Sequence, residues 1–158
     1  MPGYGLGIRP LQIGKSIVSG EAAYKMMKQE EKVLSYITEQ EVQEFLQALI
    51  RARSDNPPGD TRAAAKVCMD KFQEYGIEAE LLTAPDSEVS VLYPDTDNSK
   101  VQSVIAAISG EEGPVLLMNA HIDTVRAGNL EEWKYDPFAA VIEDGYIYGR
   151  GAGDDKGA

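Results

Sequence analysis

The chain has 158 residues, of which 43% are hydrophobic and 26% are charged, and its formal net charge is −11. This length allows one ordinary domain with a sizeable core. The acidic balance, without any dense run of Lys and Arg, excludes nucleic acid as a partner. No apolar stretch approaches the roughly 20 residues of a membrane span, and the N-terminus lacks the apolar run of a secretory signal. We therefore expect a soluble cytoplasmic protein with no membrane partner.

The first 25 residues carry five glycines and little apolar content, with neither a helical nor a strand period. We expect residues 1–25 to form an unstructured N-terminal arm. A better helical sequence begins at Met26, and residues 26–158 are expected to form the domain.

The next segment carries the signals of a helix start. Thr38 followed by Glu41 is a capping box, in which each side chain satisfies a free amide of the first helical turn. The helical spacing of apolar residues then predicts a helix to about Arg53 with one apolar face: Val42, Phe45, Leu46, Leu49 and Ile50. The sequence Asn56–Gly59 contains two prolines and should end it.

A second helix should start at Asp60 or Thr61 and stop at Gly76. Its expected inner face consists of five residues: Ala64, Val67, Cys68, Phe72 and Tyr75. Cys68 is the only cysteine, so it forms no internal disulfide. Its apolar neighbours predict a buried thiol rather than a nucleophile.

Beyond Gly76 the pattern favours strands separated by turn residues. The predicted strands are Ile77–Thr83, Val89–Tyr93, Val101–Ile108 and Val115–Asn119. The last of these is apolar on both faces, which predicts a central strand covered on each side. A hairpin is expected from Ala140–Glu143 and Tyr146–Tyr148, joined by Asp144–Gly145.

The only histidine follows the predicted central strand, at the sheet edge where ligands gather. His121 and Asp123 are two residues apart on an extended segment, so both side chains can face one cleft. A metal-bound imidazole usually donates its second N–H to an acceptor such as this carboxylate. Alone, however, a histidine at a strand end is more often structural or exposed than a metal ligand.

Asp154 and Asp155 follow in a turn with glycines at 149, 151, 153 and 157. Glycine lets the backbone adopt conformations that other residues avoid. Acidic residues packed in such a turn must be solvated, paired or bound to a cation. The alternative is a solvated surface turn.

Four ordered motifs resemble the M20 metallopeptidase family, which includes acetylornithine deacetylases, desuccinylases, carboxypeptidase G2-like enzymes and dipeptidases. The motifs are His121–Val125, Trp133–Phe138, Asp144–Ala152 and Asp154–Gly157. The resemblance is strong over 115–158, weaker from about Glu39, and absent from residues 1–25. It implies an α/β fold: a three-layer zinc-exopeptidase-like catalytic domain with a mixed, mainly parallel central sheet, cut before its later strands.

By this resemblance, His121 is a ligand of one zinc ion and Asp154 bridges two zinc ions. Asp123 is the acidic catalytic-site residue that supports them, and Asp154–Asp155 is a candidate non-proline cis bond. Cobalt or manganese could replace zinc. The implied reaction is metal-assisted attack of water on the amide of an N-acyl amino acid or short peptide.

The family's general base and next ligand form a Glu-Glu pair after the bridging aspartate, and a second histidine follows further on. The sequence contains neither after Asp154. The pairs Glu111–Glu112 and Glu131–Glu132 precede it in expected surface turns. We therefore expect an N-terminal part of the catalytic domain, inactive alone and poorly soluble, without the lid or dimerisation domain of a parent that could be a homodimer.

Two other functions remain open. A non-catalytic binding or structural module derived from this fold would hold no zinc. A nucleotide-binding domain would use Gly149, Gly151 and Gly153 as a phosphate loop. That spacing is not G-x-G-x-x-G, and the carboxylates of Asp154 and Asp155 would repel phosphate.

Overall fold

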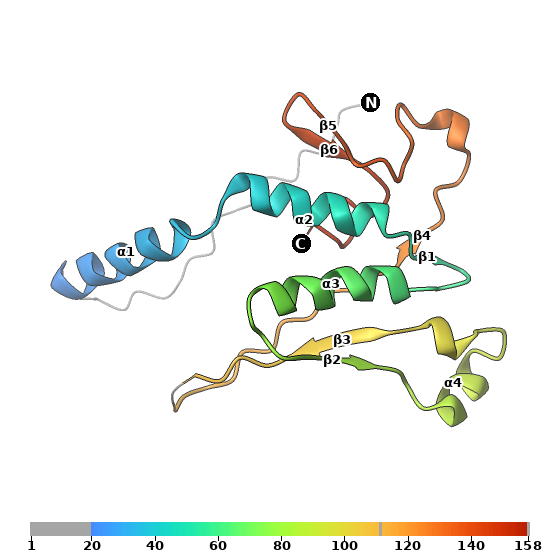
Figure 1. The fold of residues 1–158 in the computed structure, drawn as a ribbon, viewed down its shortest axis with the longest axis horizontal. Helices are drawn as coiled ribbons and strands as arrows, with labels where there is room; N and C mark the ends of the chain where they lie inside the picture. The colour runs from blue at the N-terminus through green and yellow to red at the C-terminus, as the bar shows by residue number, and fades with distance from the viewer. Residues whose placement is uncertain (1–19, 111, 158) are drawn as a thin grey trace, which may run out of the picture. The chain divides into compact units, whose positions relative to one another are not determined.

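The structure is a computed structural model, which describes residues 20–110 and 112–157 (Figure 1). The chain divides into two units, one ending at Thr38 and the other spanning Glu39–Ala158. The first unit contains helix α1 (Gly20–Leu34). Most of the expected arm, residues 1–19, lies outside the described residues. Helix α1 begins ahead of Met26, because Glu21-Ala22-Ala23 is also a good helical sequence.

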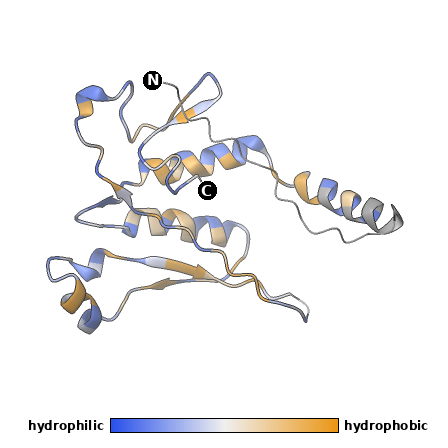
Figure 2. Ribbon diagram, turned by 180° about the vertical axis from the view of Figure 1, so that it is seen from behind, coloured by the Kyte–Doolittle hydropathy of each residue, from blue (hydrophilic) through white to orange (hydrophobic). Residues whose placement is uncertain are grey.

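Two amphipathic helices open the second unit, as predicted. Helix α2 (Glu39–Arg51) begins directly after Thr38, and helix α3 (Arg62–Glu74) ends before Gly76, whose φ is +67°. Hydrophobic and hydrophilic residues alternate around both helices (Figure 2). Helix α2 packs on α3, and α3 packs on strands β2 and β3.

The start of α3 differs in detail from the prediction. Thr61 is the N-cap residue, but its side chain makes no cap bond. Its Oγ1 instead donates to the Gln102 carbonyl and accepts from the Gln102 amide, each at 2.7 Å. Asp60 accepts from the Arg62 amide at 3.2 Å. The threonine thus ties the helix start to the segment that leads into β3.

Six short strands form three two-stranded sheets in the described residues. Strands β1 (Asp55–Asn56) and β4 (Thr124–Val125) are parallel. Two antiparallel pairs follow the predicted positions: β2 (Ala79–Leu82) with β3 (Ser103–Ala106), and β5 (Val141–Glu143) with β6 (Tyr146–Tyr148). Two short 3₁₀ turns, η1 (Asn98–Lys100) and η2 (Leu130–Glu132), complete the elements. The described residues thus combine helices with small sheets, of which one is parallel and two are antiparallel.

The turn between β5 and β6 confirms the predicted hairpin. Asp144 and Gly145 have φ values of 51° and 80°. Positive φ at both central residues is what a tight two-residue turn requires, and the Asp-Gly pair tolerates it.

The predicted strand Val89–Tyr93 is wrong, because residues 89–92 belong to helix α4 (Asp86–Leu92) and Tyr93 is the C-cap of that helix. Pro85 is its N-cap, and Asp86 and Glu88 lie in the first turn. Acidic side chains interact favourably with the free amides of a helix start. This local signal overrides the strand preference of the valines.

The predicted central strand Val115–Asn119 is also wrong, since none of these residues is in a strand in the structure. Val115, Leu116, Leu117 and Met118 are 82–95% exposed. A strand that is apolar on both faces becomes buried only where neighbouring strands and helices cover it. In the described part of the chain, β2 and β3 pair with each other and leave this segment without a partner.

The buried apolar core of the described residues is small. It comprises residues of α2, α3 and the start of the β5–β6 hairpin: Leu49, Ile50, Ala64, Ala65 and Ala140. Tyr75, expected on the inner face of α3, is 56% exposed, because it follows the last helical turn. None of the described helices is long and apolar enough to cross a membrane.

Candidate metal site

The parallel pair β1 and β4 brings the Asn56–Gly59 turn beside the segment that carries His121. Thr124 donates its amide to the Ser54 carbonyl at 3.0 Å, and the Ser54 hydroxyl donates to the Ile122 carbonyl at 2.6 Å. Ser54 is 1% exposed, so these bonds are shielded from water. They fix the backbone on which His121 and Asp123 stand.

The His121 ring lies between two carboxylates. Its Nδ1 is 3.0 Å from the Asp123 carbonyl oxygen and 3.1 Å from Asp123 Oδ1. Its Nε2 is 3.0 Å from Asp154 Oδ1. Residues 33 positions apart in the chain therefore meet at one imidazole, as the spacing of the sequence motifs leads us to expect.

The hydrogen bond to Asp154 raises the pKa of His121 above its ordinary value, and the neighbouring Asp123 carbonyl and carboxylate add to the effect. Burial acts in the opposite direction but is weaker, since the side chain is 49% exposed. Two acceptors facing two ring nitrogens stabilise the imidazolium form. The same arrangement favours a cation in place of the proton.

Asp154 reaches the histidine from the glycine-rich turn that follows β6. The Asp154–Asp155 peptide bond is cis, as the sequence comparison suggested. Asp155 points its Oδ2 toward the His121 amide at 3.4 Å, while the Asp154 side chain is 92% exposed. Gly149 lets this turn pack closely on α2, because a Cβ there would lie 2.5 Å from Ile50 Cγ2.

Lys156 anchors the other end of the turn. Its side chain is buried, and its Nζ donates to the carbonyls of Leu49 and Ala52 at 2.7 and 2.9 Å. These carbonyls belong to the C-terminal end of α2, where a cation also complements the helix dipole. Burial lowers the pKa of Lys156, and the charge of Asp55 opposes that shift.

The side chains at this site suit a divalent cation such as zinc. Imidazole nitrogen and carboxylate oxygen are typical zinc ligands. Two ligand atoms on one tetrahedral zinc lie roughly 3 to 3.5 Å apart, and His121 Nε2 and Asp154 Oδ1 are 3.0 Å apart. Within the described ranges, no group of three or more potential ligands gathers to complete a coordination shell. The described chain thus brings two candidate ligands and one supporting carboxylate together.

The other sequence candidates lie away from this site. Glu131 and Glu132 form part of the surface turn η2, Glu112 is exposed, and Glu111 lies outside the described residues. Cys68 is a partly buried free thiol whose pKa is raised by burial, which fits an unreactive structural cysteine.

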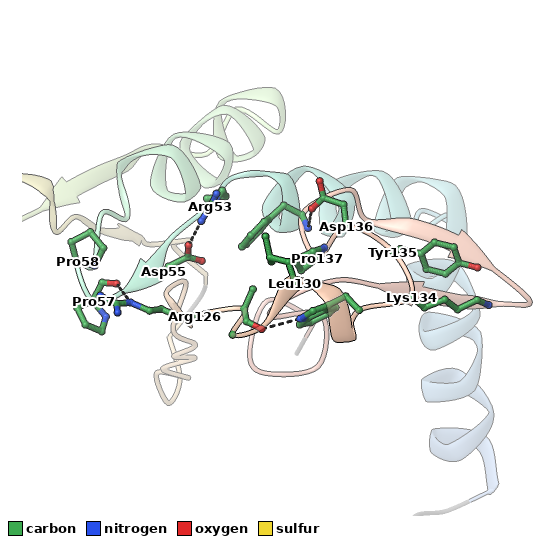
Figure 3. Close-up of a pocket in the computed structure, with 14 residues that line it drawn as sticks. Arg53, Asp55, Pro57, Pro58, Arg126, Leu130, Lys134, Tyr135, Asp136 and Pro137 are labelled. Carbon is green, nitrogen blue, oxygen red and sulfur yellow. Dashed lines mark hydrogen bonds and ion pairs between the residues drawn. The ribbon is translucent and has the colours of Figure 1, made fainter.

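The described residues form two cavities of about 720 Å³ each, of which one borders the site. One is bordered by Asn56, His121 and Asp123, and it extends under α3 and β3. The other, drawn in Figure 3, lies between the Pro57–Pro58 turn and residues 126–138. Figure 3 shows Arg53 paired with Asp55 and Arg126 donating to the Pro57 carbonyl.

Sequence reasoning missed the Lys156 anchor and the contact of Asn56, whose Nδ2 donates to Asp123 Oδ2 at 3.0 Å. The prolines after Asn56 indicated a helix end, and nothing local indicated that its side chain reaches Asp123. The signal that could have found it is a polar side chain fixed in extended backbone before Pro-Pro.

Comparisons with known proteins find relatives for this part of the chain. Residues 117–158 match the model of a family described as Peptidase family M20/M25/M40. A "Succinyl-diaminopimelate desuccinylase" of Ehrlichia ruminantium (strain Gardel) is 38% identical over 89 residues, which are 56% of this chain and 21% of the relative. A protein of the same name from Methylobacterium radiotolerans is 38% identical over 113 residues, which are 70% of this chain and 25% of the relative.

The chain thus spans about a fifth to a quarter of the length of the curated relatives it matches. The family match covers the histidine, the hairpin and the glycine-rich turn, which are the elements that build the site. The chain therefore carries, in residues 117–158, the sequence of a part of the M20/M25/M40 peptidase family, and it is similar over a longer stretch to enzymes named succinyl-diaminopimelate desuccinylase.

Proposed function

We propose that the natural protein containing this chain is a metal-dependent hydrolase of amide bonds in N-acyl amino acids or short peptides. The observation that carries the proposal is the His121 ring, held between Asp123 on Nδ1 and Asp154 on Nε2 at 3.0 to 3.1 Å. The names of the relatives add succinyl-diaminopimelate as a first substrate to test.

In this proposal His121 and Asp154 are metal ligands, and zinc is the metal, with cobalt or manganese as alternatives. Bound metal ions would polarise the scissile carbonyl and acidify the attacking water. The chain's own contribution is positional. Asp123 accepts a hydrogen bond from Nδ1–H, which fixes the tautomer and leaves the Nε2 lone pair directed at the cation.

Asp154 would supply a carboxylate oxygen and its negative charge to the cation, from a backbone turn anchored to α2 by Lys156. A rigid anchor matters, because small errors in the position of a reacting group reduce the rate strongly.

We also propose the three-layer α/β fold with a mainly parallel central sheet, a cytoplasmic location and a homodimeric parent. The parallel pairing of β1 with β4 supports the proposed sheet, and the acidic composition supports the proposed location.

The test is hydrolysis of succinyl-diaminopimelate and of N-acetyl amino acids by the natural protein, with and without zinc. The variants His121→Ala and Asp154→Asn should lower kcat by more than about 100-fold, beyond the roughly 10- to 100-fold effect of outer-shell residues. Asp144→Asn is the matched control, because asparagine tolerates the positive φ of that hairpin turn. A zinc-loaded protein without activity on any of these amides would instead support a non-catalytic module.

A further inference from the structure

The side chain of Asn56 is part of the hydrogen-bonded chain at the candidate metal site. Its Nδ2 donates to Asp123 Oδ2 at 3.0 Å. The other oxygen of that carboxylate, Oδ1, faces His121 Nδ1 at 3.1 Å, and His121 Nε2 faces Asp154. Asn56, Asp123, His121 and Asp154 therefore form one continuous row of polar contacts.

The backbone holds Asn56 in register for this contact. In the parallel pair of β1 with β4, Asn56 lies opposite Val125, two residues beyond Asp123. The turn after Asn56 is closed by the Gly59 amide, which donates to the Asp55 carbonyl at 2.8 Å. Because both strands are only two residues long, the bonds of Ser54 to the 122–124 segment are needed to keep this register.

The amide group is oriented by its surroundings on both sides. A carboxylate can only accept hydrogen bonds, so the NH₂ group of Asn56 must face Asp123. The amide oxygen then faces Gly59, where a Cβ would lie 3.3 Å from Asn56 Oδ1. Gly59, whose φ is +82°, thus leaves room for the orientation that the carboxylate requires.

We propose that Asn56 is a positioning residue that holds the Asp123 carboxylate against His121 Nδ1 and so directs Nε2 at the metal. This inference rests on the proposed function of His121 and Asp154. A neutral amide suits the task, since it fixes one carboxylate oxygen without cancelling the negative charge that the imidazole needs. An arginine or lysine at this position would pair with Asp123 and weaken its hold on the ring.

The experiment compares three variants of the natural protein. Asn56→Leu keeps the branched shape and removes the N–H donor, whereas Asn56→Gln retains an amide on a side chain one methylene longer. Asn129→Leu is the control, because Asn129 is an exposed asparagine whose contacts are confined to the η2 turn. Circular dichroism and the denaturation midpoint establish that each variant is folded.

The first readout is zinc affinity, measured by competition with a chelator and independent of activity. Asn56→Leu should weaken zinc binding about 10- to 100-fold, the range seen for residues that orient metal ligands. Asn56→Gln should recover at least part of the loss, and Asn129→Leu should bind zinc like the unaltered protein. A folded Asn56→Leu variant with zinc affinity within twofold of the unaltered protein overturns the inference.

The second readout is steady-state kinetics at saturating zinc. Asn56→Leu should lower kcat while KM changes less than twofold, because a positioning residue does not touch the substrate. A raised KM with unchanged kcat would make Asn56 a substrate contact and refute the assignment. If the unaltered protein binds zinc but hydrolyses no amide, the proposed function fails, while the zinc measurements still decide the role of Asn56.

Discussion

The tight packing of the glycine-rich turn makes Gly151→Ala an informative substitution. Gly151 has a φ of +85°, and an added Cβ would lie 2.6 Å from Thr124 Cγ2 and 3.2 Å from Lys156 Cδ. Thr124 is 4% exposed, and Lys156 is held by two hydrogen bonds from its Nζ. Neither neighbour can move aside without breaking other contacts.

Two penalties add at this position. The left-handed backbone conformation costs a residue with a Cβ about 1 to 2 kcal/mol. Forcing a methyl group into a packed site costs about 1 to 3 kcal/mol more. Gly151→Ala should therefore lower the free energy of unfolding by about 2 to 5 kcal/mol. Because the same turn carries Asp154, activity should fall as well.

The matched control is Gly153→Ala in the same turn, where an added Cβ would meet nothing within 4 Å. Its effect should stay within about 0.5 kcal/mol, as for an ordinary surface substitution. Urea denaturation of the natural protein measures both values. In a Thr124→Ala background the clash with Thr124 Cγ2 disappears, but the φ penalty and the 3.2 Å contact with Lys156 Cδ remain, so the loss caused by Gly151→Ala should shrink without vanishing. Equal losses for the alanines at 151 and 153 would refute the packing argument.

Three further predictions concern charge and exposure. Lys156→Met should destabilise the fold by about 2 to 4 kcal/mol, because the carbonyls of Leu49 and Ala52 would each lose a charge-assisted hydrogen bond while remaining away from water. The control Lys66→Met removes an exposed ion pair and should cost less than about 1 kcal/mol in the same urea assay. In the metal-free chain, an NMR titration of His121 should give a pKa above 6.5, and Asp154→Asn should lower it. Folding raises the pKa of His121, so its contact with Asp154 stabilises the fold fully at a pH below the unfolded-state pKa of about 6.5. This stabilisation is lost as the pH rises through the pKa of His121 in the folded chain. Leu117→Lys should increase the solubility of the 158-residue chain, measured by light scattering, because that side chain is 84% exposed in an apolar segment; unchanged scattering would mean that the segment is covered in solution.

Local signals predicted the elements that depend on neighbouring residues. Helices α2 and α3 follow from apolar spacing and from the turn residues at their ends. The β5–β6 hairpin follows from Asp144–Gly145, whose positive φ values suit that dipeptide. Helix α4 was missed, because the acidic first turn after Pro85 outweighed the valines that favour a strand.

The prediction of a buried central strand is wrong for a different reason. The apolar run at 115–118 predicts a strand covered on both faces, yet each of its side chains is more than four-fifths exposed. An apolar segment is more stable when it is removed from water, but its burial depends on whether other segments lie where they can cover it. No local pattern contains that information.

For the site, residue types and their spacing already indicate the chemistry: one histidine after an apolar segment, an acidic partner two residues later, and a carboxylate pair in a glycine-rich turn. Which of these groups meet depends on the folded chain. It brought Asp154 to His121, joined Asn56 to Asp123, and tied Lys156 to the end of α2. Residue type fixes what a group can donate or accept. The distances between groups far apart in the chain are set by strand register and helix packing, which arise only when the whole chain is folded.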